Sequence, residues 1–258
     1  MELDINPVYR NFFYRITLPM KVAAKGLLDM MKWLVKATKY ESIDEWTCVA
    51  AAQEGQLEAL KWLKEHGRDM NEWVCWTAAR NGHLEVLKWA RENGASWDLK
   101  SSAKDNIRCD ASGRQPVPLC SIAQSGHLDV LKFAIDCGGV FHPKTCEDAA
   151  RGGYLDILKW ARENGCSWDE ATCAAAALGG HLEILKWARE NGAPWDYRTL
   201  SIAASKRNME VLEWVLINGH WEPAQLEDAI QKGVALFSCG CWTIKMLSHR
   251  FDFALQAK

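Results

Sequence analysis

Apolar and polar residues recur along this chain with the period of an amphipathic α-helix. In the stretch GHLEILKWARENG, residues 180–192, the apolar side chains fall on one side of such a helix: Leu182, Ile184, Leu185, Trp187 and Ala188. Side chains three or four positions apart share a helix face, so this pattern predicts a helix with a broad buried face. We expect the helix to end at Gly192, because glycine adopts the left-handed conformation of a C-cap without strain.

The same stretch returns at regular intervals, which makes the chain a repeat array. Close copies begin at Gly82 and Gly153, and looser copies begin at residues 26, 55, 126 and 207. The step is 27 residues from 126 to 153, from 153 to 180 and from 180 to 207, whereas the step from 82 to 126 is 44 residues. A fixed period of this length is typical of elongated arrays in which each repeat covers the apolar face of its neighbour.

A second, shorter helix is predicted before each amphipathic helix. In EATCAAAAL, residues 170–178, small side chains allow close backbone approach, Asp169 is a candidate N-cap, and two glycines follow. The same position, 11 residues before the repeat glycine, is occupied in other repeats by Asp44, Asn71 and Asp196. Two such helices cannot bury their apolar surfaces alone, and β-strand signals are lacking. The sequence therefore predicts an all-α solenoid of stacked helix-turn-helix repeats.

The repeat frame divides the chain into three parts. Residues 17–219 are predicted to form the repeat array of seven hairpins, and residues 220–258 a degenerate terminal repeat with a C-terminal cap. Residues 1–16 match no repeat and carry an aromatic cluster, so we expect them to cap the exposed face of the first repeat. An alternative interprets residues 17–34, in which Leu-Pro precedes aliphatic residues, as an F-box-like segment of a substrate adaptor for a ubiquitin ligase.

The stretch AARNGHLEVLKWARENGASWD, residues 78–98, resembles an ankyrin repeat in its Ala-Ala, Gly-His-Leu-Glu and Glu-Asn-Gly-Ala segments. It lacks the Thr-Pro-Leu-His opening of the familiar 33-residue unit, and it is six residues shorter. The missing residues fall in the family's β-hairpin finger, so the fingers are expected to be reduced or absent. The short Trp-rich form is similar to ankyrin-like repeats of giant DNA viruses and of algal and oomycete genomes. The resemblance implies a non-catalytic module that binds a partner protein through inner helices and adjoining loops.

The overall charge gives no sign of a nucleic-acid or membrane partner. Lys and Arg total 31 against 33 Asp and Glu, a net charge of -2, so the chain has no strong field to gather nucleic acid or an anionic membrane. Arg10 and Arg15 interrupt the N-terminal stretch where a secretory signal would be apolar, and no run approaches the roughly 18 apolar residues of a membrane span. We expect an intracellular, cytoplasmic monomer with an unidentified protein partner.

The long step of the array carries about 17 extra residues, roughly residues 99–115, which are polar and precede two prolines. Two interpretations stay open. The segment is a tolerated surface insertion, because long loops cost little additional free energy, or it contacts a partner through Lys104, Arg108 and Arg114.

Two positions of the repeat account for most of the 14 tryptophans. Six lie seven residues after the repeat glycine position: Trp33, Trp62, Trp89, Trp160, Trp187 and Trp214. Three lie fifteen residues after it: Trp97, Trp168 and Trp195. A residue at a fixed phase in every repeat faces the neighbouring repeat, so we expect a stacking ladder in the core and not a ligand-binding box.

The inner helices supply the candidate contact surface. Trp46, Trp73 and Trp76 belong to neither ladder position. Trp76 stands where other repeats have different residue types, such as Val49 and Glu147, and such variation favours a partner contact over a role in the fold. A polar row two residues before the glycine adds further candidates. The predicted partner-binding residues are Trp73, Trp76, Arg80, Gln124, Glu147 and Arg151, and simple solvation is the alternative for this strip.

Cysteine and histidine also recur in phase, which argues against a catalytic or metal site. The repeat cysteines, seven residues before the glycine, are Cys48, Cys75, Cys146 and Cys173, and the repeat histidines, one residue after it, are His83, His127 and His181. Adjacent copies lie one repeat apart, roughly 9 to 10 Å, beyond the roughly 4.4 to 6.8 Å between α-carbons that a disulfide spans. A lone C-x-C at Cys239 and Cys241 is weak support for a metal. With no known catalytic motif present, we expect no catalytic residue, metal or cofactor.

Overall fold

The structure is a computed structural model of the 258-residue chain, and it describes residues 18–38, 43–97, 119–142, 144–206 and 208–234. All regular secondary structure in these ranges is helical, in agreement with the predicted all-α class. The predicted N-terminal cap, residues 1–16, and the insertion, residues 99–115 with Lys104, Arg108 and Arg114, lie outside the described residues. Cys239, Cys241 and most of the predicted C-terminal cap lie outside them as well.

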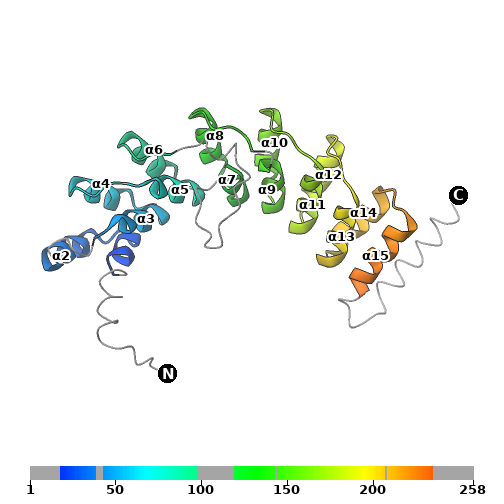
Figure 1. Ribbon diagram of the computed structural model, residues 1–258, viewed down its shortest axis with the longest axis horizontal. Coiled ribbons are helices and arrows are strands. Elements are labelled where there is room, and N and C mark those ends of the chain that lie inside the picture. Colours follow the sequence, from blue (N-terminus) through cyan, green and yellow to red (C-terminus); the bar gives the residue numbers. More distant parts are fainter. Residues whose placement is uncertain (1–17, 39–42, 98–118, 143, 207, 235–258) are drawn as a thin grey trace, which may run out of the picture. The chain divides into compact units, whose positions relative to one another are not determined.

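The described residues between 18 and 142 belong to an N-terminal unit of stacked helical hairpins. Residues 18–24 are helical and precede the first labelled helix. The helices that follow are α2 (Leu28–Thr38), α3 (Glu45–Gln53), α4 (Leu57–Glu65), α5 (Glu72–Arg80), α6 (Leu84–Glu92), α7 (Leu119–Ser125) and α8 (Leu128–Asp136). The inner helices α3, α5 and α7 form one row, and the outer helices α4, α6 and α8 form a second row beside it (Figure 1). The prediction that each inner helix is shorter than its outer helix is wrong, because α3, α4, α5 and α6 have nine residues each.

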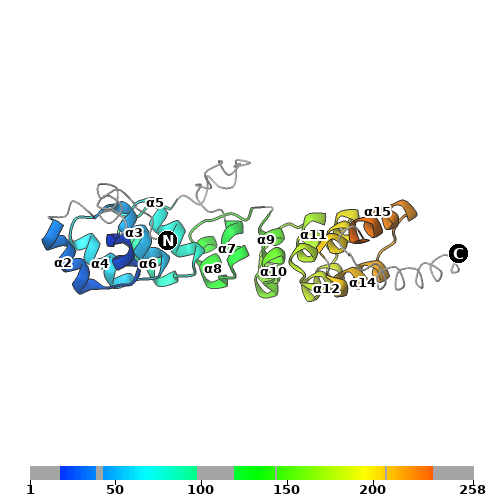
Figure 2. The same ribbon diagram turned by 90° about the horizontal axis from the view of Figure 1, so that it is seen from below.

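The described residues between 144 and 234 belong to a C-terminal unit with the same two-row construction. Its helices are α9 (Thr145–Gly152), α10 (Leu155–Glu163), α11 (Glu170–Gly179), α12 (Leu182–Glu190), α13 (Tyr197–Lys206), α14 (Met209–Asn218) and α15 (Pro223–Val234). The inner row consists of α9, α11, α13 and α15, each packed on the next, and the outer row consists of α10, α12 and α14 (Figure 2).

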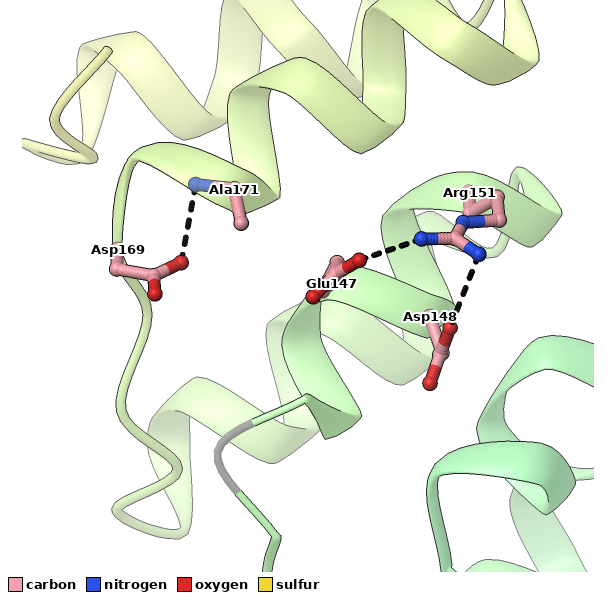
Figure 3. Close-up of polar contacts among 5 residues, drawn as sticks. All are labelled: Glu147, Asp148, Arg151, Asp169 and Ala171. Atoms are coloured by element: carbon pink, nitrogen blue, oxygen red, sulfur yellow. Dashed lines mark hydrogen bonds and ion pairs between the residues drawn. The ribbon is translucent and has the colours of Figure 1, made fainter. Parts of the chain in front are cut away.

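The helix ends follow from local chemistry. The side chain of Asp44 accepts a hydrogen bond from the backbone N–H of Thr47 at 3.1 Å. Asp169 accepts one from the backbone N–H of Ala171 at 3.0 Å (Figure 3), so both aspartates satisfy an amide that the helix leaves unpaired. Asn71 occupies the N-cap position of α5, but its side chain makes no capping bond. At the other end of α11, Gly180 adopts φ 78°, the left-handed conformation that glycine favours.

The core lies between the two helix rows. Six consecutive residues of α11 are buried, from Thr172 to Ala177, and small side chains at these positions allow the inner helices to pack closely. On α12 the buried residues are Ile184, Leu185 and Ala188, whereas Leu182 and Trp187 are half-buried. Full burial of one leucine or isoleucine contributes about 1.5–3 kcal/mol, so the repeated aliphatic pair holds each hairpin to its neighbours.

Candidate functional site

Successive repeats are joined through the repeat histidines. Nε2 of His83 lies 2.9 Å from the carbonyl oxygen of Gln53 in the preceding inner helix, and Nε2 of His181 lies 3.2 Å from the carbonyl oxygen of Arg151. Since a carbonyl only accepts, Nε2 donates in both contacts. The preceding glycine makes room for the ring: a Cβ atom on Gly153 would lie 2.6 Å from His181 Cε1. These histidines therefore bind neighbouring backbones and do not converge, as predicted from their spacing.

The tryptophans also join neighbouring repeats, although not as a buried core ladder. The ring centroids of Trp168 and Trp187 are 5.7 Å apart in an edge-to-face arrangement, and the guanidinium of Arg162 lies 4.1 Å from the centroid of Trp168. The prediction that the two tryptophan positions face neighbouring repeats is supported. The predicted burial is wrong for Trp33, which is 62% exposed, and Trp187 is only half-buried.

Trp76 lies in the core, and its predicted place in the contact surface is wrong. The side chain is 1% exposed, and its ring packs edge-to-face on Trp97 with centroids 5.6 Å apart. Trp97 comes from the loop after α6 and covers the Trp76 ring from outside the inner helix. Variation between repeats at this position therefore does not place Trp76 on the surface.

The other candidates of the N-terminal unit do reach solvent. Arg80 ends α5, is exposed, and makes no ion pair with another described residue. Gln124 on α7 is exposed too, and Trp73 near the start of α5 is half-buried. These three side chains lie on the inner-helix row, where a partner can contact them.

The candidates of the C-terminal unit are bonded to their own helix. The guanidinium of Arg151 donates a hydrogen bond to Glu147 and lies 3.9 Å from the carboxylate of Asp148, all on α9 (Figure 3). Arg151 and Glu147 are half-buried. This strip therefore offers a partner a partly neutralised surface, in contrast to the unpaired Arg80.

The repeat cysteines are buried thiols, as predicted. Burial raises the pKa of Cys48, Cys75 and Cys173 from 9.0 to about 12, because the interior disfavours the thiolate. One pair of neighbouring cysteines was not predicted from the equivalent positions of the repeats. The side chains of Cys146 and Cys166 are hydrogen-bonded, which raises the pKa of Cys146 and lowers that of Cys166, and both are buried free thiols.

The outer and inner helices differ in how far their exposed side chains recur from one repeat to the next. On the outer helices an acidic residue and a lysine three positions later recur and pair: Glu58 with Lys61 at 2.7 Å, Glu85 with Lys88 at 3.1 Å, and Glu183 with Lys186 at 2.8 Å. On the inner helices the position two residues before the glycine differs between neighbouring repeats, although Gln and Arg each occur twice: Gln53, Arg80, Gln124, Arg151, Leu178 and Ser205. These three outer helices thus share one ion pair, whereas neighbouring inner helices present different side chains at this position.

The fold can now be compared with solved structures. The ankyrin repeat domain of human ASB11 matches with a TM-score of 0.57 at 18% sequence identity, over 79% of this chain and 98% of that one. This chain has the ankyrin-repeat fold. Residues 171–216, which span α11 to α14, also match the family described as ankyrin repeats (many copies). No curated protein matches the sequence.

The ankyrin-repeat assignment explains the paired rows of helices, and the described ankyrin repeats contain no β-strand. The more specific likeness, to short Trp-rich ankyrin repeats, stays a prediction. None of the helices within the described ranges has both the length and the apolar character needed to cross a bilayer. Among the described residues, no group of three or more His, Cys, Asp or Glu side chains is placed to hold a metal ion.

Proposed function

We propose that this chain is a non-catalytic protein-interaction module, which binds a partner protein through the inner helices and adjoining loops of its ankyrin repeats. One observation carries the proposal: the same ion pair recurs on the outer helices α4, α6 and α12, whereas neighbouring inner helices differ in the side chain two residues before the repeat glycine. A stack built only for stability has no need of this difference. A surface that recognises one partner does, because specificity depends on an individual arrangement of side chains.

The candidate surface is revised by the burial of Trp76. In the N-terminal unit it consists of Trp73, Arg80 and Gln124, and in the C-terminal unit the candidates are Glu147 and Arg151. Arg80 is the strongest of these candidates, because it is exposed and its charge is not paired with any residue that the structure describes. The buried free thiols support a reducing, intracellular setting.

The alternative function, a substrate adaptor for a ubiquitin ligase, depends on reading residues 17–34 as an F-box-like segment and not as part of a repeat. Gly26 has φ 63°, and a Cβ on it would lie 2.3 Å from Oε1 of Gln56 in the next repeat. This is the same joint that the later repeats make at their glycines. The contact supports the interpretation of these residues as a first repeat and gives the ubiquitin-ligase adaptor no separate support.

The test is affinity capture with two charge reversals that lie on opposite faces of one repeat. Arg80→Glu changes the inner face, and Lys88→Glu changes the outer face, where the lysine pairs with Glu85 of its own helix. We expect wild type and Lys88→Glu to recover the same partner and Arg80→Glu to lose it, with all three chains equally helical by circular dichroism. Equal recovery by Arg80→Glu, or loss with Lys88→Glu, would contradict the proposed surface.

A further inference from the structure

Two tryptophans at the start of neighbouring inner helices have no aromatic partner. Trp46 is the second residue of α3 and is 39% exposed, and Trp73 is the second residue of α5 and is half-buried. Within the described ranges neither ring stacks on another ring, receives a cation or makes a hydrogen bond. By contrast, tryptophans such as Trp97 and Trp168 of the inter-repeat ladder are engaged by rings and guanidinium groups.

The charges around these rings are mostly negative. Glu45 and Glu72 directly precede the two tryptophans, are exposed, and make no ion pair with the described residues. Asp69 is exposed just before α5 as well, and the nearby cations Lys64 and Arg68 are half-buried, with Lys64 3.6 Å from the Asp69 carboxylate. Unlike the glutamates of the outer helices, Glu45 and Glu72 are not neutralised by a lysine one turn away.

The two aromatic positions have a defined spacing. Trp46 and Trp73 are 27 residues apart and occupy the same position in adjacent repeats, and α3 and α5 pack side by side (Figures 1 and 2). Neighbouring helices lie about 8–10 Å apart, so the two rings repeat at about that distance. In a polyproline II segment, side chains at i and i+3 point the same way and are about 9 Å apart, because each turn has three residues with a rise of about 3.1 Å.

We infer that Trp46 and Trp73, with Glu45 and Glu72, form a docking site for an extended basic segment of the partner protein, in which two arginines three residues apart lie on the two rings. This inference rests on the proposed function and adds the chemistry of the partner. Arginine suits the site because its guanidinium stacks on an indole face while it pairs with a carboxylate. Single-stranded nucleic acid also stacks on tryptophan, but these glutamates repel its phosphates.

The probe is a fluorescein-labelled peptide, Gly-Arg-Pro-Pro-Arg-Gly, titrated with the full chain and followed by fluorescence anisotropy. We expect saturable binding that weakens with added salt. Trp46→Ala with Trp73→Ala should raise the Kd about tenfold, because each exposed cation–π contact accounts for roughly a two- to fivefold effect. Glu45→Gln with Glu72→Gln should raise the Kd about threefold and flatten its salt dependence.

The C-terminal unit offers a matched control. Glu170 opens α11 as Glu72 opens α5, but it is followed by Ala171 and not by tryptophan. Glu170→Gln should leave the Kd unchanged. A control peptide with glutamate in place of both arginines should not bind, and a peptide whose arginines are two residues apart should bind more weakly than the probe.

Several outcomes would overturn the inference: equal affinity for the acidic peptide, an unchanged Kd in the double tryptophan variant, or tighter binding of an oligothymidylate of eight nucleotides. Failure of the inference differs visibly from failure of the proposed function. If the partner is captured by wild type and by the Trp46→Ala, Trp73→Ala variant but not by Arg80→Glu, the inner face binds a protein and the arginine site is wrong. If Arg80→Glu captures the partner as wild type does, the proposed surface is wrong as well.

Discussion

The joint between repeats makes a quantitative prediction at Gly153. Replacement by alanine places a side chain at φ 89°, which costs about 1–2 kcal/mol for an L-residue in the left-handed region. It also puts the new methyl group 2.6 Å from Cε1 and 2.9 Å from Nε2 of His181. The ring must move away from the Arg151 carbonyl, and the lost hydrogen bond costs a further 0.5–1.5 kcal/mol or so. We expect Gly153→Ala to lower the free energy of unfolding by about 2–3 kcal/mol.

Gly165 is the matched control because it lies in the same repeat with nearly the same backbone. Its φ is 85°, but a Cβ there meets no atom within 4 Å. Gly165→Ala therefore has the conformational cost alone, about 1–2 kcal/mol. The two variants differ by about 1 kcal/mol, and about 2–4 °C of midpoint per kcal/mol applies to a chain of this size, so they should melt roughly 2–4 °C apart when followed by circular dichroism at 222 nm.

A double-mutant cycle separates the joint from general strain. His181→Ala should destabilise wild type by about 1 kcal/mol, since it removes one hydrogen bond, and should have almost no effect in Gly153→Ala, where the bond is already lost. The reasoning would be refuted by equal melting of Gly153→Ala and Gly165→Ala, or by the same loss from His181→Ala in both backgrounds.

Three further predictions follow from the packing and charges. Trp76→Ala should cost about 3–5 kcal/mol in urea unfolding because the ring is buried, whereas Trp73→Ala should cost less than about 1 kcal/mol; similar losses would contradict the burial of Trp76. Arg162→Ala should lower stability by about 1–2 kcal/mol, because the guanidinium contacts the Trp168 ring and donates to the Cys166 carbonyl, and Arg162→Lys should recover little of the loss in thermal melting. The thiols of Cys48, Cys75 and Cys173 lose their protons near pH 9.0 in the unfolded chain and near pH 12 in the folded chain. The free energy of unfolding should therefore fall with rising pH in this range, by about 1.4 kcal/mol per pH unit for each of the three thiols. A triple alanine variant at these cysteines should reduce the slope in urea titrations at several pH values; an unchanged slope would contradict the assignment.

The helical frame was predictable because it depends on local chemistry. Inner helices of small residues alternate with amphipathic outer helices, and glycines such as Gly180 follow the helix ends. Short segments of the sequence determine these features, because they depend on hydrogen bonding and burial within one hairpin. The predicted caps at Asp44 and Asp169 are confirmed by their hydrogen bonds. The contact surface is a different kind of property, because it depends on what the neighbouring repeat and its loop cover.

Trp76 and Cys166 show why a comparison of equivalent positions in the repeats did not predict which residues are in contact. Comparing like positions treats each repeat as equivalent, so the change from Val49 to Trp76 suggested exposure. The structure shows instead that a loop residue at another phase, Trp97, packs against this ring. Cys146 meets Cys166 in the same way, between two phases of one repeat. Contacts between unlike positions need the geometry of the hairpin, which the spacing of like residues does not contain.

The histidine–glycine joint has a consequence for how such a chain can change over time. It uses one backbone carbonyl and one bare α-carbon of a repeat, together with one imidazole of the next, and none of the inner-helix side chains that face solvent. A repeat that is duplicated or moved within the array could therefore pack against its new neighbour through the same contact. Lengthening by gene duplication and diversification of the displayed side chains can proceed independently of one another.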